Sequence, residues 1–372
     1  MEKLDFTITT LGSRTVHSPM LLSRKRGDYM ANYVDDDQCV LYDIETSVDA
    51  PARSFQRSEL LEKAGPREKI YFDPADVHAG IVTCGGLCPG LNDVIRAIVM
   101  CLWYHYGVKR ISGIRFGYRG LLSQFALPVM ELTPGNVLDI HRKGGTILGS
   151  SRGYGDRTEE IVDSLQRMNI NILFTIGGDG TQKGALNISQ QAGKRGLELA
   201  VVGVPKTIDN DLSFVEKSFG FETAVSKAVD AVASAHIEAT NALNGVGIVK
   251  VMGRESGFIA AHTALAINDV NYVLIPEVPF DLDGESGLLV HLQERLERRN
   301  HAVILVAEGA GQDLMDSSTL YDASGNKKLG DIGVFLKEKI GAYFKEKHIE
   351  LNLKYIDPSY IIRSTPANPN DS

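Results

Sequence analysis

The stretch INILFTIGGDGTQKGALNISQQAG, residues 170–193, decides the fold class. It begins with a continuous apolar run at 170–176, passes through the glycine loop GGDG at 177–180, and ends in a helical segment at 181–193. A strand that is apolar throughout, rather than at alternate positions, is typical of a strand buried on both faces of a parallel sheet. The stretch therefore predicts a buried strand, a loop open to ligands and a covering helix.

Working outward, the same alternation of apolar strand and helix recurs along most of the chain. Upstream, VHAGIVT at 77–83 predicts a buried strand, GGLCPG at 85–90 a glycine loop, and the segment from Asn92 a helix. Further strands are expected at 111–116, 199–204, 246–252, 271–276 and 301–309, and further helices at 133–142, 158–169, 222–239, 258–267, 288–299 and 331–347. Strands that alternate with helices predict parallel sheets covered on both faces, a doubly wound α/β architecture.

Several helix starts carry residues that are typical N-caps. Asn92, Thr158 and Thr181 each stand before a helical segment, and Thr133 is followed by Pro134 at the expected first helical position. These residue types accept hydrogen bonds from the free backbone amides of a first turn. We therefore expect a helix to begin directly after each of them.

The pattern of apolar and polar segments divides the chain into three parts. Residues 1–69 are irregular, and we expect an N-terminal extension that wraps the main body. The strand and helix segments that follow are expected to form two doubly wound lobes with mainly parallel sheets, one at 70–213 and one at 214–372.

Composition excludes several classes of protein. A net charge of −8 over 372 residues argues against nucleic acid and against anionic membranes as partners. The start, MEKLDFTITT, lacks the pattern of a secretory signal, and no apolar run approaches the ~20 residues of a membrane-spanning helix. The few cysteines suggest no disulfide framework, and Cys84 and Cys88 lack a second pair or a nearby histidine for a metal. Together these observations predict a cytoplasmic protein.

In doubly wound sheets, ligands bind outside the carboxyl ends of the strands. Five loops at such ends carry glycine or acid clusters: GGLCPG, GGDG, PKTIDND, MGRESG and AEGAGQD. GGLCPG suits phosphate binding through backbone amides at a helix N-terminus, although a glycine turn can also be purely structural. GGDGT places Asp179 where it can hold Mg²⁺ directly or through water, the alternative being an ordinary Asp-Gly turn.

The loop PKTIDND combines two acids with a lysine and a threonine. Asp209 and Asp211 can divide the labour, one accepting a proton from a substrate hydroxyl and the other holding a metal. Lys206 and Thr207 can bind phosphate oxygens. A solvated cap before the next helix would explain the acids, but not the lysine and threonine beside them.

Three arginines stand at loops or strand ends of a chain that is acidic overall. Arg254 and Arg363 are each expected directly after a strand, and Arg152 in a loop. Together they suggest a multiply anionic ligand, although a surface ion pair is an equal alternative for any one of them. Glu308 ends an apolar strand, where it can hydrogen-bond sugar hydroxyls or serve as a cap.

The order of these loops resembles that of the 6-phosphofructokinases, and the resemblance covers residues 77–372. GGDGT alone also occurs in NAD and lipid kinases, but those lack TIDND and MGR. The resemblance implies a phosphofructokinase-like fold with the nucleotide in the lobe at 70–213 and the sugar phosphate in the lobe at 214–372. It also implies Mg²⁺-assisted phosphoryl transfer from ATP to the 1-hydroxyl of fructose 6-phosphate, a step of glycolysis. A homotetramer is expected, because active sites of the family take groups from a neighbouring subunit.

The resemblance further implies the roles of individual residues. Asp209 would be the general base and Arg254 the second catalytic residue, while Asp179 would serve the Mg²⁺. The residues implied for the nucleotide are Gly86, Arg152, Gly153, Asp179, Gly180, Thr181 and, on the following helix, Lys227. The residues implied for the sugar phosphate are Thr207, Ile208, Asp209, Asp211, Met252, Gly253, Arg254, Glu308, Tyr360 and Arg363.

Three features depart from the family's commonest pattern. Lys206 is frequent in pyrophosphate-using members, but Gly180 stands where those members typically carry a second aspartate, so ATP is expected and pyrophosphate is the alternative. Tyr360 stands where many members have histidine, and a phenol can still donate to a phosphate. The sequence ends at STPANPNDS, where Asp371 and Ser372 look like caps of a further helix. The family's C-terminal helices are therefore expected to be missing, which leaves an inactive ligand-binding chain as a third reading.

Overall fold

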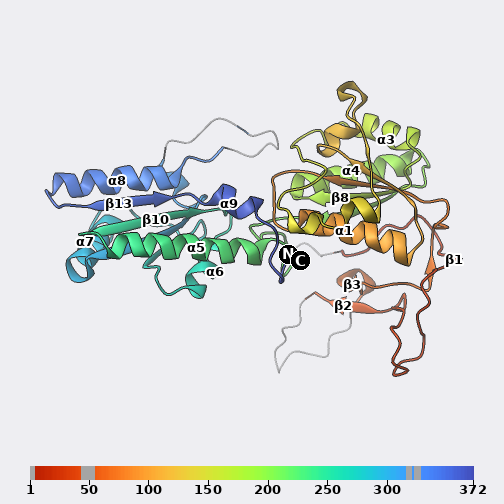
Figure 1. Cartoon of the computed structure of the whole chain (residues 1–372), viewed down its shortest axis with the longest axis horizontal. Coiled ribbons are helices and arrows are strands. Elements are labelled where there is room, and N and C mark those ends of the chain that lie inside the picture. Colours follow the sequence, from red (N-terminus) through yellow and green to blue (C-terminus); the bar gives the residue numbers. More distant parts are fainter. Residues whose placement is uncertain (1–4, 43–54, 316–320, 322–327) are drawn as a thin grey trace.

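The computed structural model describes residues 5–42, 55–315, 321 and 328–372. Two lobes lie side by side along the longest axis, each a sheet with helices packed on it (Figure 1). The α/β class and the mainly parallel sheets predicted from the sequence are confirmed. Short 3-10 turns occur at Arg57–Glu59, Gly117–Leu121, Ser123–Phe125, Ile140–Arg142 and Gln312–Leu314.

The first lobe is built on a sheet with the strand order β7-β6-β5-β8-β9. All neighbours are parallel except β7, which pairs antiparallel with β6. The strands are β5 (His78–Thr83), β6 (Arg110–Ile114), β7 (Met130–Glu131), β8 (Ile172–Gly177) and β9 (Ala200–Pro205). The helices are α1 (Leu91–Met100, continued by a π-helical turn at Cys101–His105), α2 (Pro134–Val137), α3 (Thr158–Arg167) and α4 (Asp179–Lys194).

The central strand β5 is buried on both faces of this sheet, which explains its continuous apolar sequence. Ile81 of β5 packs in a cluster with Ile95 of α1, while the next residue, Val82, packs in another cluster with Ile161 of α3 and Ile188 of α4. All five side chains are fully buried. Successive strand residues point to opposite faces, so a strand covered on both sides needs apolar side chains at every position.

The second lobe has an all-parallel sheet with the order β11-β12-β10-β13. Its strands are β10 (Gly245–Val251), β11 (Tyr272–Leu274), β12 (His301–Ala307) and β13 (Asn352–Ile356). Helices α5 (Phe221–Thr240) and α6 (Phe258–Ala266) cover one face, and α7 (Leu288–Arg299) and α8 (Ile332–Glu346) cover the other. A short helix, α9 (Ser359–Ser364), follows β13.

The N-terminal extension carries two short antiparallel ladders at one side of the first lobe (Figure 1). They pair β1 (Val16–His17) with β4 (Lys69–Ile70) and β2 (Cys39–Leu41) with β3 (Leu60–Glu62). Much of the remaining described extension is irregular. The domain boundaries predicted after residues 69 and 213 stay a prediction.

Of the predicted N-caps, the structure confirms only Thr133, whose side chain accepts a hydrogen bond from the Asn136 backbone amide ahead of Pro134. Helix α1 begins earlier than expected, so Asn92 lies inside it and hydrogen-bonds the loop at 143–147 instead. Thr158 is the first helical residue of α3 rather than its cap. Thr181 lies in the first turn of α4, which begins at Asp179 after Gly178. The N-cap positions are instead taken by Gly90, Arg157 and Gly178, one to three residues before the polar side chains.

The position predicted for Arg363, directly after a strand, is wrong. Arg363 lies on α9, and the strand before it is β13, which the sequence pattern did not reveal. Polar Asn352 and Lys354 interrupt the apolar run of β13, which is an edge strand of its sheet. An edge strand is not buried on both faces and along both sides, so it does not need a continuous apolar sequence.

Candidate active site

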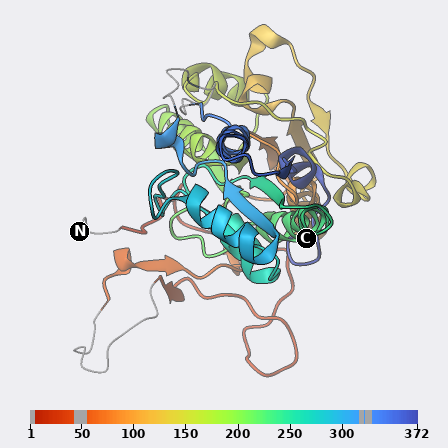
Figure 2. The ribbon, with the colours of Figure 1, turned by 90° about the vertical axis from the view of Figure 1, so that its left-hand side faces the viewer.

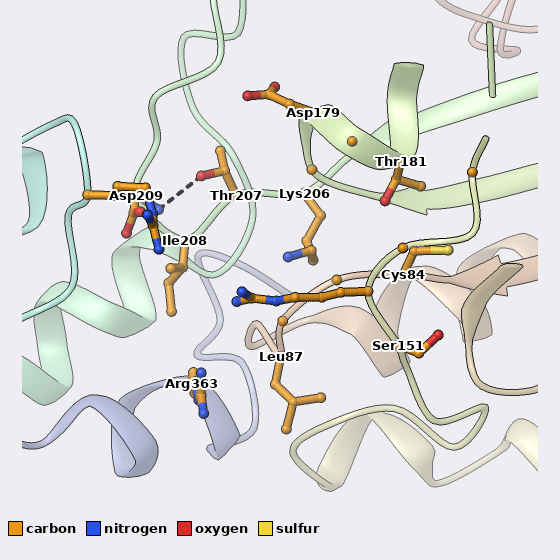
Figure 3. Close-up of a pocket in the computed structure, with 18 of the residues that line it drawn as sticks. Cys84, Leu87, Ser151, Asp179, Thr181, Lys206, Thr207, Ile208, Asp209 and Arg363 are labelled. Atoms are coloured by element: carbon orange, nitrogen blue, oxygen red, sulfur yellow. Dashed lines mark hydrogen bonds between the residues drawn. The ribbon is translucent and has the colours of Figure 1, made fainter. Parts of the chain in front are cut away.

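A cavity of about 1120 Å³ opens where the carboxyl ends of the two sheets face each other. Its lining comes from both lobes and includes the loops after β5, β8 and β9 of the first lobe and after β10 and β12 of the second. Figure 3 shows part of this lining, with Lys206 between Asp179 on one side and Leu87 and Arg363 on the other. The loops singled out in the sequence therefore meet in one place.

Two first-lobe loops form one wall of the cavity. The backbone amide of Gly85 donates to the Ser151 carbonyl at 3.0 Å, and the Ser150 hydroxyl donates to the Gly85 carbonyl at 2.7 Å. A side chain at Gly86 would come within 3.7 Å of the Arg152 guanidinium. Gly86, Arg152 and Gly153 all line the cavity, so this wall presents backbone and one guanidinium to a ligand.

The GGDG loop contributes the N-terminus of α4. Asp179 is its first residue, exposed at the edge of the cavity, and Thr181 is buried in the first turn. Apart from its two chain neighbours and the backbone of its own helix, no described atom lies within 4 Å of the position that a Cβ on Gly180 would take. Gly180 therefore leaves open space beside free backbone amides, an arrangement suited to an anionic ligand.

The TIDND loop is a tight, internally bonded turn. Thr207 accepts a hydrogen bond from the Asp209 amide at 3.1 Å, and its hydroxyl donates to Asp211 at 2.6 Å. Asn210 has a φ of 57°, in the left-handed region, and its side chain accepts from the Ser218 amide at 2.7 Å. Asparagine tolerates this conformation better than most residues. The loop thereby places Thr207, Ile208, Asp209 and Asp211 together on the cavity wall.

Asp209 has the environment of a general base. Burial raises the pKa of its carboxyl to about 7, helped by the neighbouring carboxylates of Asp211 and Glu308 and opposed by a backbone hydrogen bond from Arg254. Among the described residues, its buried Oδ1 has no hydrogen-bond partner. A carboxylate poised near neutral pH with one free oxygen can accept a proton from a substrate hydroxyl.

Lys206 supplies a buried positive charge beside this carboxylate. Among the residues that the structure describes, Lys206 is the only charged residue that is buried, with 8% of its surface exposed. Burial lowers the pKa of its ammonium group, while the Cys88 thiol and Asp209 act in the opposite direction. A buried ammonium at a cavity wall is a natural partner for a phosphate group.

The second lobe contributes Met252, Arg254 and Glu308 from the loops after β10 and β12. Burial raises the pKa of Glu308, and the charges of Arg254 and Lys250 oppose that shift. Gly253 is not among the cavity-lining residues that the structure describes; it has a φ of 122°, and a Cβ there would lie 2.3 Å from the Ser256 carbonyl oxygen. Its role is to let the chain turn between Met252 and Arg254.

Helix α9 places Tyr360 and Arg363 at the far end of the cavity. The Arg363 guanidinium lies 4.5 Å from the centre of the Tyr360 ring. Lys227, by contrast, lies on α5 outside the described lining, where its ammonium pairs with Asp230 at 3.1 Å. The expectation that Lys227 reaches the donor phosphates therefore has no support in this geometry.

The cavity also contains residues that the sequence reasoning missed. Lys183 and Asn187 of α4 extend the first-lobe wall, and Lys250 and Asp357 stand among the second-lobe residues. A signal was present for Lys250, because it is the one charged residue in the otherwise apolar strand GVGIVKV. Asp357 could not be found, because its strand was not recognised.

The described residues contain no group of three or more His, Cys, Asp or Glu side chains arranged to hold a metal ion. Cys84 and Cys88 are buried, and burial raises the pKa of both thiols to about 12. The lack of such a group among the described residues does not oppose Mg²⁺ at Asp179, because Mg²⁺ commonly uses one or two carboxylates together with substrate phosphates and water. The exposed Asp179 beside the open space at Gly180 fits that mode of binding.

Fold and site together define an α/β protein with a large polar cavity between two lobes. The family model for phosphofructokinase matches residues 78–372. An ATP-dependent 6-phosphofructokinase of Borreliella burgdorferi is 56% identical over 100% of this chain and 84% of its own length. One of Amycolatopsis methanolica is 50% identical over 99% of this chain and 82% of its own.

A solved pyrophosphate-dependent phosphofructokinase of Nitrosospira multiformis has a TM-score of 0.65 at 21% identity, over 80% of this chain and 73% of that one. At this level of identity the likeness concerns the fold alone. The chain belongs to the phosphofructokinase family.

Proposed function

We propose that this enzyme transfers the γ-phosphoryl group of ATP to the 1-hydroxyl of fructose 6-phosphate, giving fructose 1,6-bisphosphate in glycolysis. The proposal rests chiefly on one observation: Asp209, with its pKa raised to about 7, stands in a cavity that also holds arginines from both lobes. Curated relatives of 50–56% identity carry the name of an ATP-dependent 6-phosphofructokinase, which supports ATP over pyrophosphate as donor.

The residues divide the work by lobe. Gly86, Arg152, Gly153, Gly180 and the first turn of α4 bind the nucleotide phosphates. Thr207, Ile208, Asp211, Met252 and Glu308 surround the sugar, and Tyr360 with Arg363 holds its 6-phosphate. Phosphoryl transfer needs positioning and charge stabilisation more than covalent chemistry, and these groups supply both.

Two residues act at the reacting atoms. Asp209 accepts the proton of the attacking hydroxyl through its free carboxylate oxygen, and Arg254 stabilises negative charge on the transferring group. Asp179 holds Mg²⁺, which when bound neutralises charge on the donor phosphates. Lys206 adds a fixed positive charge from the cavity wall.

The experiment that tests this assignment compares the parent with Arg363→Ala. Loss of one charge-assisted contact to a phosphate is worth about 1.5–3 kcal/mol, roughly ten- to over a hundredfold in affinity. We expect the affinity for fructose 6-phosphate to fall by that factor while the affinity for ATP hardly moves. A fall in ATP affinity instead would mean that the two ligand sites are reversed.

We further propose a homotetramer in the cytoplasm, with no nucleic acid or membrane as partner. The net charge of −8 and four free thiols support this setting. No helix in the part of the chain that the structure describes is long and apolar enough to cross a bilayer. Light scattering of the purified protein tests the tetramer, and a mass close to 40.6 kDa would contradict it.

A further inference from the structure

Lys250 is an unusual residue for its place in the fold. It lies in β10, which is hydrogen-bonded on both sides, to β12 and to β13. The other residues of β10 are all buried, and none of them carries a charge. The Lys250 side chain is itself only 12% exposed. An ammonium group in such a position is costly unless carboxylates compensate it.

Two carboxylates provide that compensation. The Lys250 ammonium lies 2.9 Å from Asp357 and 3.1 Å from Asp331, and the Tyr355 hydroxyl donates to Asp331 at 3.1 Å. Burial opposes the charge of Lys250, but hydrogen bonds to Asp357, Tyr355 and Asp331 outweigh it and raise the pKa. The pKa of Asp357 is lowered: burial opposes the charged form, but the hydrogen bonds from Lys250 and Ser359 prevail.

Each carboxylate holds the start of a helix with its other oxygen. Asp357 accepts from the Ser359 amide at 3.1 Å and from the Ser359 hydroxyl at 2.6 Å, at the first residue of α9. Asp331 accepts from the amides of Gly333 and Val334 and caps α8. One ammonium group thus links the centre of the sheet to the beginnings of two helices.

We propose that Lys250 is a positioning residue for the acceptor: by holding Asp357, it fixes α9 and thereby places Tyr360 and Arg363 against the sugar phosphate. This inference rests on the proposed assignment of those two residues to the 6-phosphate. Lys250, Asp357, Ser359, Tyr360 and Arg363 all line the same cavity. Positioning is favoured over direct contact with the substrate, because the Lys250 ammonium is already engaged by two carboxylates.

The test compares Lys250→Met and Asp357→Asn with a matched control, Asp331→Asn. The control breaks the other contact of the same ammonium but leaves the link to α9 intact. We expect Lys250→Met and Asp357→Asn to weaken fructose 6-phosphate binding by about tenfold or more, the order expected when a binding group shifts slightly. Calorimetric Kd and KM at saturating Mg-ATP should agree, and the KM for ATP should stay within about threefold of the parent.

The control variant should lose stability, seen as a lower Tm, and keep its affinity for fructose 6-phosphate. Equal weakening by Asp331→Asn and Asp357→Asn would overturn the proposal, because the effect would then not run through α9. So would an unchanged affinity in Lys250→Met. If Lys250→Met does not fold, Asp357→Asn against Asp331→Asn decides the question.

The double variant Lys250→Met/Asp357→Asn separates positioning from independent contacts. If the two residues act through their pair, the double variant should bind fructose 6-phosphate about as weakly as either single variant. Multiplied effects would mean that each residue touches the substrate by itself. Arg363→Ala, measured in parallel, separates a failure of this inference from a failure of the proposed function. If Arg363→Ala binds fructose 6-phosphate as tightly as the parent, the proposed function is contradicted. If Arg363→Ala binds it more weakly and Lys250→Met does not, only this inference is contradicted.

Discussion

At the scale of single residues, the environment of Asp209 favours catalysis but lowers the stability of the folded protein. Its raised pKa means that the folded protein must ionise a carboxyl that burial and the charges of Asp211 and Glu308 disfavour. The folded state therefore binds this proton more tightly than the unfolded state does, and its stability declines as pH rises from the ordinary aspartate range through about 7. The residue is useful for proton transfer because it is poorly accommodated as an anion.

Asp209→Asn should therefore change turnover and stability in opposite directions. Loss of a general base typically costs ~10²–10⁴ in rate, so kcat should fall by that order while ATP affinity is kept. Without ligands at about pH 8, the Tm should rise, because the variant lacks the carboxylate whose ionisation burial and the neighbouring acids disfavour. Activity assays measure kcat, and thermal melts measure the Tm. Turnover within about threefold of the parent would remove Asp209 from the mechanism.

The pH dependence of the parent should show the same group. Protonated Asp209 cannot accept the substrate proton, so kcat/KM should fall as pH drops below about 7. After burial, the Asp211 carboxylate is the largest cause that raises this pKa. In Asp211→Asn the acid limb should move to lower pH, whatever the loss in absolute rate. An acid limb that stays in place would mean that another group controls it.

Gly180 decides how much room the donor has. Gly180→Asp would put a carboxylate into the open space beside the first turn of α4. Two unit charges at ~4 Å with an effective dielectric near 20 repel by about 4 kcal/mol, so ATP use should fall by roughly a thousandfold. Pyrophosphate-dependent activity should be spared or revealed, because Lys206 can still meet that ligand. The measurement is kcat/KM with each donor; unchanged ATP use would make Gly180 a turn residue only.

At the scale of elements, helix termini fix the relation of the two lobes. The carboxylate of Asp371 accepts hydrogen bonds from the Thr223 amide and hydroxyl, both at 2.6 Å, at the N-terminus of α5. The Ser372 hydroxyl donates to Asp93 of α1 at 3.0 Å. Sequence reasoning assigned Asp371 and Ser372 to the start of a further helix, whereas here Asp371 caps a helix that begins far earlier in the chain.

Asp371→Ala should cost about 0.5–2 kcal/mol of stability, the usual worth of an N-cap carboxylate. Denaturant melts of the parent and the variant measure the change. Asn370→Ala is a suitable control, because Asn370 is exposed and its backbone amide, which donates to the Asn368 side chain at 3.1 Å, is kept in the variant. Equal stability of the two variants would show that the contact to α5 contributes nothing.

At the scale of the whole molecule, the cavity is the place where a ligand can couple the lobes. Its lining runs from Gly86 in the first lobe to Arg363 in the second. Seen end-on, the helices of the second lobe lie in front of the first (Figure 2). Residues of both lobes line the cavity, so a ligand that fills it would touch both. A ligand that binds only the folded protein stabilises it by about 2.7 kcal/mol at a hundredfold excess over its Kd.

Fructose 6-phosphate should therefore raise the melting temperature of both lobes together. The single tryptophan, Trp103, lies just after α1 and reports the first lobe by fluorescence, while circular dichroism reports the whole chain. We expect equal shifts by the two probes in the parent and little shift by either in Arg363→Ala. A shift in circular dichroism without one in Trp103 fluorescence would show that the lobes unfold independently of the shared site.

The features that repeat locally could be predicted from the sequence alone. Continuous apolar runs predicted the strands buried on both faces, such as β8 and β12, because such strands have no polar side to show. The glycine and acid loops after those strands predicted most of the cavity, because carboxyl ends of parallel strands gather at one edge of a sheet. Helix α7 was predicted at its observed bounds, 288–299.

Features that depend on partners distant in the sequence became apparent only in the folded protein. The role of Asn92 depends on a loop about 50 residues away, that of Asp371 on α5, and that of Lys250 on two carboxylates from other elements. The pKa of Asp209 depends on Glu308 in the other lobe. Burial and opposed charges arise only when segments far apart in the sequence meet in the fold, so no local pattern can contain them.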